Sequence, residues 1–434
     1  MRTLLILSFA TFLSITVRSQ EVITLEKVVA TSLQNNHGII AAKNNIEIAN
    51  NNATVGNAGL LPQVGANAGF NGGINNSKIE FAGNNPDLEV DGATSRSTNA
   101  SLNLNYTIFS GFSGRNTYKK LKGLNTLTET QTQLAIENTL MQVINGYYLA
   151  AKFQEQLLIA ENALVITKER LERVNNQFEF GTANKLAVLN AQVDLNTDSV
   201  NLINTQLNFN NSIRNLMFLM GDTNGETFVI DTIVSFSLEG ALDELINKSL
   251  QNNASVLAAA HTLTLSEYDL KISQSRKYPT LSLNSSYGYN QSANDGSFIA
   301  QSSSVGFSGG LSLSYNLFNG KQATINAQNA KINIESNTEK KLEAEDLVRK
   351  EVKNTYDTYQ TRLAILAMEK QNKKTAKVNF ERSKIAFELG QITTTQFREA
   401  QLNLIRSQNR INTAKFDAKL SEMDLIRLAG MLIE

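Results

Sequence analysis

The sequence predicts a mainly helical, internally duplicated protein that also carries membrane β-strands. Three observations indicate this fold class: long helical patterns that recur in the second half of the chain, pairs of uncharged segments that alternate between apolar and small polar residues, and a glycine-bearing bend in each half. After residue 19 no apolar run approaches the roughly 20 residues that a membrane helix requires. Any membrane-spanning part must therefore consist of strands.

The composition argues against a catalytic or nucleic-acid-binding protein. The 434 residues include no cysteine, two histidines, and 40 basic against 40 acidic residues. Without cysteine the chain forms no disulfide and carries no lipid anchor on an N-terminal cysteine. Balanced charge without a basic block gives no reason to expect nucleic acid as a partner. No spacing of His, Asp or Glu suggests a metal site or a nucleophile–base set, so we expect no enzyme and no cofactor.

Residues 1–19 have the pattern of a signal peptide. Arg2 gives a short basic start, and an apolar stretch too short for a stable membrane helix follows it. Val17 and Ser19 place small residues at −3 and −1 of a cleavage site before Gln20. The mature chain is therefore expected to leave the cytoplasm.

The duplication is clearest at two helical bends. RVNNQFEFGTANKLAVLNAQ at 173–192 returns as RSKIAFELGQITTTQFREAQ at 382–401, and SLQNN at 32–36 returns at 249–253. A glycine after an amphipathic run favours the end of a helix, because glycine adopts the left-handed backbone conformation at little cost. Each copy is thus predicted to be the bend of a helical hairpin.

We therefore divide the chain into two repeats joined by a linker. The repeats are 20–220 and 241–434, and residues 221–240 link them, with Phe228, Ile230, Ile233 and Phe236 able to add a short strand or to pack on the helices. Each repeat is expected to contain three parts: an opening helix at about 22–58 or 241–277, a β-hairpin at 62–109 or 279–318, and a long helical hairpin at 113–220 or 321–430.

Proline marks the change from helix to strand in each repeat. The residue before a proline is disfavoured in the helical conformation, so Pro62 and Pro279 are predicted helix-to-strand switches. In the segments that follow, apolar residues such as Leu102 and Leu104 alternate with small polar residues such as Asn103. Such alternation over about ten residues is the pattern of a membrane β-barrel strand.

The near absence of charge from these segments favours a membrane over water. Between Tyr278 and Gly320 the only charged residue is Asp295, at the expected hairpin loop. An ordinary hairpin packed on helices is the alternative, but its wet face would carry Lys, Glu or Arg. Four strands also cannot close a barrel, and an open edge in lipid leaves backbone groups without partners. Copies of the chain are therefore expected to share one barrel in the membrane.

Taken in order, these features resemble the TolC-type outer-membrane efflux protein family over nearly the whole mature chain. The resemblance rests on the tandem duplication, the proline-led strand pairs, the glycine-bearing bends, and Tyr-x-x-Phe-x-Gly at 106–111 and 315–320. By this resemblance Phe109, Gly111, Phe318 and Gly320 are strand-to-helix switches. The resemblance implies a homotrimer in which four strands per chain form a 12-stranded barrel in outer-membrane lipid and the long helices form an α-barrel across the periplasm.

The same resemblance implies an exit duct for efflux or type I secretion. A periplasmic adaptor, or membrane fusion, protein and an inner-membrane RND or ABC transporter would be its partners. The bend residues Gly181, Thr182, Gly390 and Gln391 resemble the tips that contact the adaptor, although helix stops without a partner role give the same pattern.

Two residues correspond to the family's periplasmic aperture, which two aspartates one helical turn apart surround. Counted from Gly390, these positions are Gln396 and Glu399, so only Glu399 keeps an acid. Three glutamates from three chains would then form the ring. The alternative is that Glu399 pairs with Arg398 or with a lysine of a neighbouring chain.

Two other functions remain open from the sequence. A secreted helical filament or appendage protein of the flagellin type shares the polar composition without cysteine or tryptophan, but the cleavable signal and the charge-free strands argue against it. An outer-membrane scaffold with a sealed lumen would share every feature except conduction.

Overall fold

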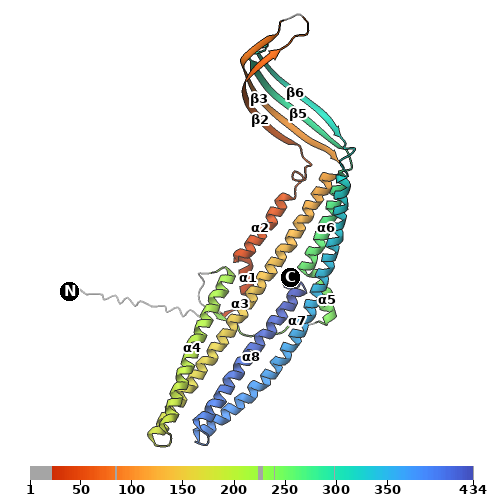
Figure 1. The fold of residues 1–434 in the computed structure, drawn as a ribbon. Helices are drawn as coiled ribbons and strands as arrows, with labels where there is room; N and C mark the ends of the chain where they lie inside the picture. The colour runs from red at the N-terminus through yellow and green to blue at the C-terminus, as the bar shows by residue number, and fades with distance from the viewer. Residues whose placement is uncertain (1–21, 84–85, 223–227, 239, 298, 434) are drawn as a thin grey trace, which may run out of the picture. The chain divides into compact units, whose positions relative to one another are not determined.

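The computed structural model describes residues 22–433 apart from 84–85, 223–227, 239 and 298, so the predicted signal peptide lies outside the described residues. The described chain divides into two compact units. One, here called unit 1, comprises described residues of 1–41, 135–247 and 351–434, and unit 2 comprises those of 42–134 and 248–350. Each unit therefore takes segments from both expected repeats. Figure 1 labels their helices and strands.

Unit 2 contains a four-stranded antiparallel sheet. Its strands β2 (Gln63–Ile79), β3 (Leu88–Ser110), β5 (Thr280–Asn294) and β6 (Gln301–Ser314) lie in the order β2-β3-β5-β6. The two hairpins lie where the alternation predicts them, and β3 and β5 join them side by side (Figure 1). The sheet leaves β2 and β6 as free edges within the described residues.

The strand register separates the sheet into two chemically distinct faces. Because side chains alternate between faces along a strand, directly opposed residues share a face. On the apolar face, Leu102 lies between Ala66 and Tyr287, and Tyr287 lies opposite Phe307. The other face, here called the polar face, comprises alternate residues of four ranges. These are Gln63 to Asn71, Ser97 to Asn105, Asn284 to Ser292, and Ser302 to Gly310.

Four helices of unit 1 form its framework. The later parts of α3 (Ser113–Glu179) and α7 (Gln322–Glu388) lie with α4 (Lys185–Met220) and α8 (Thr394–Leu428), and the earlier parts of α3 and α7 belong to unit 2. Together they form two helical hairpins, one from Ser113 to Met220 and one from Gln322 to Leu428. Their main core includes Val143, Ile144, Tyr147, Leu216 and Phe416, each at most 3% exposed.

The linker adds a short strand, as one of the two sequence alternatives proposed. β4 (Val229–Ile230) pairs in parallel with β1 (Val22–Ile23). Gln154 of α3 both donates to the Ile230 carbonyl and accepts from the Ile230 N–H, each over 2.9 Å. On α8, Glu422 accepts from the N–H groups of Ser237 and Leu238 over 2.6 and 2.8 Å, so side chains of two helices hold the linker.

The prediction of one continuous opening helix in each repeat is wrong. The structure has α1 (Leu25–Asn35) and α2 (His37–Asn52) in the first repeat, and α5 (Leu242–Asn252) and α6 (Ala254–Ser275) in the second. Each break lies at the last asparagine of SLQNN. Asn36 has φ −64° and ψ 120°, and Asn253 has φ −66° and ψ 123°. Their side chains accept from Gly38 and Ser255 N–H groups, as asparagine does where it caps a new helix.

The two proline positions differ in their distance from the preceding helix. Pro62 and Pro279 each precede the first residue of a strand, but α2 already ends at Asn52, whereas α6 ends at Ser275. The expectation that the helix ends just before its proline is therefore wrong in the first repeat. Turns occupy most of residues 53–61, with Gly59 in the left-handed region at φ 72°.

The expected strand-to-helix switches are only partly placed at strand ends. Gly111 and Gly320 both have φ 62° and stand close to the start of α3 and α7. Phe109 lies within β3, one residue before its end, whereas Phe318 lies in the connection between the end of β6 and the start of α7, so the assignment of both as switches stays a prediction. Register explains the difference, because Thr280 is the first residue of β5 and lies opposite both Ser110 and Ser314. Pro279 has no N–H with which to extend the ladder.

The four long helical segments each end at a glycine in the left-handed conformation, and alanine substitutions at two of these glycines can be compared. Gly181, Gly221 and Gly390 have φ between 71° and 73°, and Gly430 has φ 69°. A Cβ on Gly221 would lie 2.4 Å from the Asn35 carbonyl oxygen, whereas a Cβ on Gly181 would meet nothing within 4 Å. We expect Gly181→Ala to lower the free energy of unfolding by about 1–2 kcal/mol. Gly221→Ala should lower the free energy of unfolding by clearly more than Gly181→Ala does.

Thermal unfolding of the detergent-solubilised variants, followed by circular dichroism, measures this difference. Equal losses in the two variants would mean that the backbone at Asn35 yields without cost, and that the left-handed conformation alone sets the penalty.

Candidate functional site

The candidate site lies at the ends of the two helical hairpins in unit 1, where α3 meets α4 and α7 meets α8 (Figure 1). Both bends have the same backbone geometry. The Thr182 N–H donates to the Gln177 carbonyl over 2.8 Å, and the Gln391 N–H donates to the Ala386 carbonyl over 2.8 Å. With Gly181 and Gly390 left-handed, these are Schellman motifs. The four predicted tip residues are therefore exposed at the hairpin ends.

The two predicted aperture residues occupy different environments at the start of α8. Gln396 belongs to a capping box: its side-chain oxygen accepts from the Thr393 N–H over 2.9 Å, and the Thr393 hydroxyl accepts from the Gln396 N–H. Glu399 lies one turn further on and is exposed, without an ion pair among the described residues. The capping bond holds the Gln396 side chain against the helix start, so Glu399 is the freer group.

Arg398 does not pair with Glu399, because it belongs to a buried polar cluster. Its two terminal nitrogens donate to the two carboxylate oxygens of Asp198 over 2.7 and 2.8 Å. The same guanidinium donates to Gln401 over 3.0 Å, and the Thr167 hydroxyl donates to Asp198 over 2.6 Å. We call Thr167, Asp198, Arg398 and Gln401 the Arg398 cluster. It joins α3 and α4 of the first hairpin to α8 of the second.

Two further contacts extend this connection toward the bends. Arg170 donates to Asp194 over 2.5 Å, and Arg173 donates to the Glu388 carbonyl over 3.1 Å. Burial lowers the pKa of Arg170, and the hydrogen bond and charge of Asp194 oppose that shift. The Arg170–Asp194 bond joins α3 to α4 within the first hairpin, whereas the bonds of Arg398 to Asp198 and of Arg173 to Glu388 cross between hairpins. A change in the relative position of the two hairpins must therefore break these crossing bonds together.

Aromatic stacking fixes α8 against α7 beside the cluster. The Phe397 ring stacks on Phe387 with centroids 4.8 Å apart and an interplanar angle of 1°, and on Phe380 at 5.6 Å. The three rings are each at most 5% exposed. From adjacent positions on α8, Phe397 therefore contacts α7 and Arg398 contacts α3 and α4.

The sequence analysis did not identify the Arg398 cluster. Its partners come from positions 167, 198, 398 and 401, far apart in the chain, and arginine or aspartate in a helix more often faces water. A weak signal was present: Arg398 and Gln401 lie three residues apart among the apolar residues Phe397, Ala400 and Leu404, on the stripe of α8 that is buried.

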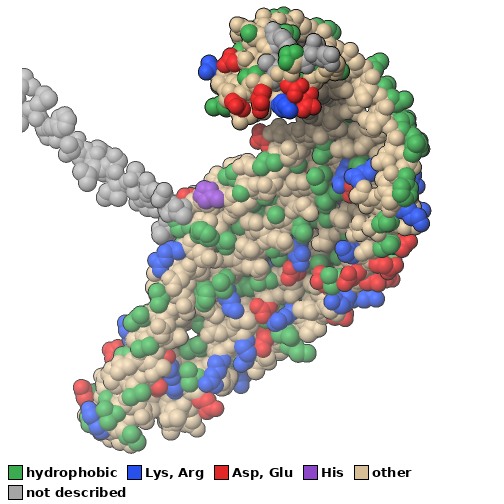
Figure 2. Space-filling model, turned by 45° about the horizontal axis from the view of Figure 1, so that its top comes forward, with side chains coloured by type: hydrophobic (Ala, Val, Ile, Leu, Met, Phe, Trp, Pro, Cys, Tyr) green, Lys and Arg blue, Asp and Glu red, His purple; other side chains and the backbone are tan. Residues whose placement is uncertain are grey.

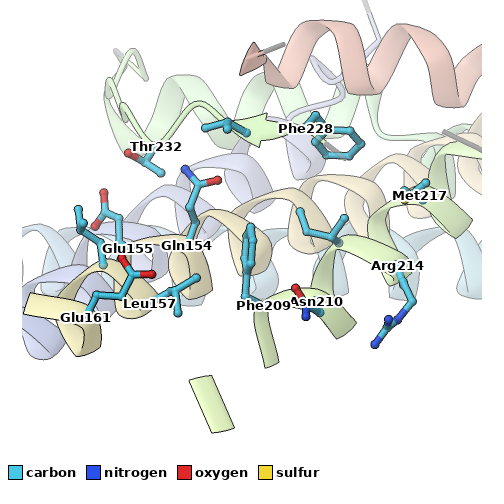
Figure 3. A pocket seen from close by; sticks show the side chains of 13 residues that line it. Gln154, Glu155, Leu157, Glu161, Phe209, Asn210, Arg214, Met217, Phe228 and Thr232 are labelled. Atoms are coloured by element: carbon cyan, nitrogen blue, oxygen red, sulfur yellow. The ribbon is translucent and has the colours of Figure 1, made fainter. Parts of the chain in front are cut away.

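A separate cavity of about 770 Å³ lies beside the linker (Figure 3). Apolar residues of α3 and α4, among them Leu157, Phe209 and Met217, line it together with Phe228 and Thr232. Glu155 and Glu161 lie toward one side and Arg214 toward the other in Figure 3. Glu155 already pairs with Lys415, so this cavity has no convergent set of free polar groups.

The described residues include no group of three or more His, Cys, Asp or Glu side chains able to hold a metal ion. Among the described helices, none combines the length and the hydropathy that crossing a membrane requires.

Comparison with known proteins assigns the chain to one family. The sequence model of the outer membrane efflux protein family matches residues 28–222 and 245–431. The chain belongs to the outer membrane efflux protein family. The two matched stretches correspond to the two repeats expected from the sequence, whose boundaries stay predictions.

Relatives of this family agree with the assignment. The outer membrane protein TolC of Vibrio cholerae serotype O1 is 24% identical over 385 residues, which cover 88% of this chain and 84% of that protein. The crystal structure of the Campylobacter jejuni CmeC outer membrane channel has a TM-score of 0.74 at 18% identity, covering 94% of this chain and 86% of CmeC. CusC, whose crystal structures address transmembrane channel formation, has a TM-score of 0.74 at 16% identity, covering 94% and 92%. At these identities the structural matches show the fold.

The efflux family membership confirms the predicted resemblance, the class of long helical hairpins with a β-sheet, and the location in the Gram-negative outer membrane with an extension into the periplasm. The chain is an outer membrane efflux channel of this family, and efflux proteins are transport proteins.

Proposed function

We propose that three copies of this chain form the exit duct of a tripartite efflux or type I secretion system. The duct passively conducts substrate that an inner-membrane RND or ABC transporter delivers, without an enzymatic step. One observation carries this proposal: a sheet with an exposed apolar face and two free edges, which a single chain leaves unsatisfied.

The sheet supports closure by other copies. Phe70, Val64, Phe307, Leu311 and Leu313 are between 67% and 74% exposed on the apolar face. Large contiguous apolar surfaces of this kind mark contact with a membrane or a protein. In lipid the unpaired backbone groups of β2 and β6 would each cost several kcal/mol, about 4 or more, unless another strand pairs with them. Pairing β2 of one copy with β6 of the next yields 12 strands in three copies.

The helices of unit 1 supply a second surface for self-association. Exposed apolar residues recur on α4 at spacings of three, four and seven, which is the pattern of a coiled-coil seam. These α4 residues are Leu186, Leu189, Val193, Val200, Ile203 and Leu207; α7 carries Met368, Val378 and Ile385, and Leu389 directly follows it. Because α3 and α8 contact each other through Gln401, α4 and α7 lie at opposite edges of the unit (Figure 1). The α4 seam of one copy is thus placed to pack on α7 of the next in a closed ring.

We propose the hairpin ends as the adaptor-binding surface. A cavity of about 620 Å³ lies between the ends of α3 and α7, lined by Arg173, Thr182, Lys384 and Phe387 among others. Gly181, Gly390 and Gln391 lie at the adjoining bends. This surface offers cations, carboxylates, amides and aromatic rings to a helical tip of a periplasmic adaptor protein.

Glu399 is the aperture residue that this proposal favours, with Gln396 beside it. Three exposed glutamates converging on one axis would attract cations and repel anions. We expect Glu399→Ala to lower the cation preference several-fold and to increase the frequency of open channels in planar bilayers. Glu381→Ala serves as the control, because it removes an exposed acid from α7 and not from α8. It should leave both the cation preference and the frequency of open channels unchanged.

The same recordings test the aperture assignment separately from the proposed duct. Channels whose selectivity does not respond to Glu399→Ala would overturn only the aperture assignment. Absence of channel activity from all three proteins would count against the duct and favour a scaffold. A secreted filament would instead lack a heat-modifiable trimer on detergent gels.

A further inference from the structure

The polar face of the sheet is chemically uniform. The face consists of Asn and Gln, which carry amides, Ser, which carries a hydroxyl, and Gly, which has no side chain. No residue of the face carries a charge. The rungs of the sheet show this across all four strands. One rung contains Gly65, Asn103, Ser286 and Ser308, and another contains Gly69, Asn99, Asn290 and Ser304.

Some of these polar side chains bond to one another. Asn103 donates to Ser101 over 3.1 Å, and the hydroxyls of Ser292 and Ser302 are 2.8 Å apart. A shallow hollow of about 420 Å³ opens on this face beside Asn103. The face is thus wettable, because amides and hydroxyls both donate and accept, but it has no fixed charge.

The charged residues of the hairpins lie away from the polar face. Arg96 lies opposite Gly72 and Ala293, on the other face. Lys78 pairs with Glu80 at 2.9 Å and with Asp87 at 3.4 Å near the end of the first hairpin. Figure 2 likewise shows charged side chains gathered at the loop end of the sheet, while the visible strands beyond are green and tan.

We propose that this face, which lines the conduit in the proposed barrel, does not discriminate among substrates by the sign of their charge. The inference rests on the proposed function, which closes the sheet with its apolar face toward lipid. An uncharged amide and hydroxyl lining hydrates cations, anions and zwitterions alike. A charged ring in the same place would attract one sign and exclude the other. The substrate class that fits is therefore polar or amphiphilic molecules of either charge, with charge selection made in the helical part.

The absence of cysteine makes this proposal directly testable. Single-cysteine variants Asn103→Cys and Ser286→Cys place a thiol on the polar face, and Leu102→Cys places one on the apolar face of the same strand as Asn103. Full-length protein in the outer membrane of intact cells is treated with methanethiosulfonates bearing either a trimethylammonium or a sulfonate group. Labelling rates are divided by those of free cysteine with the same reagents.

The expected result is that both polar-face variants react with both reagents at similar normalised rates, while Leu102→Cys resists both. A charged lining would accelerate one reagent by at least about tenfold, and such a ratio at both polar-face positions would overturn the proposal. Labelling of Leu102→Cys but not of the other two would also overturn it, because the faces would be reversed. Equal labelling at all three positions would mean that water reaches both faces, which contradicts the proposed function itself.

Discussion

Replacing Arg398 by alanine is expected to lower the free energy of unfolding of the helical hairpins by about 3–5 kcal/mol. The side chains of Arg398 and Asp198 are only 10% and 11% exposed, so the substitution leaves an uncompensated carboxylate in a desolvated site. It also removes donors to Gln401 and Thr167, which are fully buried. Chemical denaturation of the detergent-solubilised protein, followed by far-ultraviolet circular dichroism, measures the loss.

Two controls distinguish this cluster from ordinary surface charge. Arg410→Ala removes an arginine that is 54% exposed and pairs with Glu369 at 3.2 Å, so we expect at most about 1 kcal/mol. The double variant Arg398→Met with Asp198→Leu removes both buried charges and should recover much of the loss. Similar midpoints for Arg398→Ala and Arg410→Ala would show that the buried pair contributes no more than an exposed one.

Features that depend on nearby residues were predictable from the sequence. The helix ends at Gly181, Gly221, Gly390 and Gly430 follow from a glycine after a periodic run, because the closing hydrogen bonds lie within six residues. The two β-hairpins were predictable from the alternation of apolar and small polar residues and from the proline that precedes each hairpin. The breaks at Asn36 and Asn253 were missed although SLQNN was recognised as a repeat, since asparagine inside a helical pattern does not by itself indicate a cap.

Features that depend on distant residues were not predictable. Arg398 meets Asp198 across 200 positions, so no local pattern reveals that its charge is buried. The early end of β6 depends on its register with β5 and on the missing donor of Pro279. Glu399 could be located by counting from Gly390, but its place in an assembly depends on other copies of the chain.

Leu102→Arg is expected to abolish assembly into the outer membrane. Leu102 is 53% exposed on the apolar face, opposite Ala66 and Tyr287. If this face contacts lipid, an arginine there costs about 2–4 kcal/mol at mid-membrane depth. The proposed trimer would carry three such residues, so the penalties add in one barrel. The heat-modifiable trimer in outer-membrane fractions, quantified on gels against the unmodified protein, should be almost absent.

Asn103→Arg provides the matched control, because it adds the same side chain one residue further along the same strand. Its position on the polar face keeps the guanidinium in water, so we expect near-normal trimer levels. Channels of this variant should instead favour anions, since three arginines would line the conduit. The decisive quantity is the ratio of trimer between the two variants. If Leu102→Arg assembles as well as Asn103→Arg, the apolar face does not meet hydrocarbon and an alternative burial of that face must be sought. If both fail, the polar face is itself packed against protein, and it cannot serve as a water-filled path.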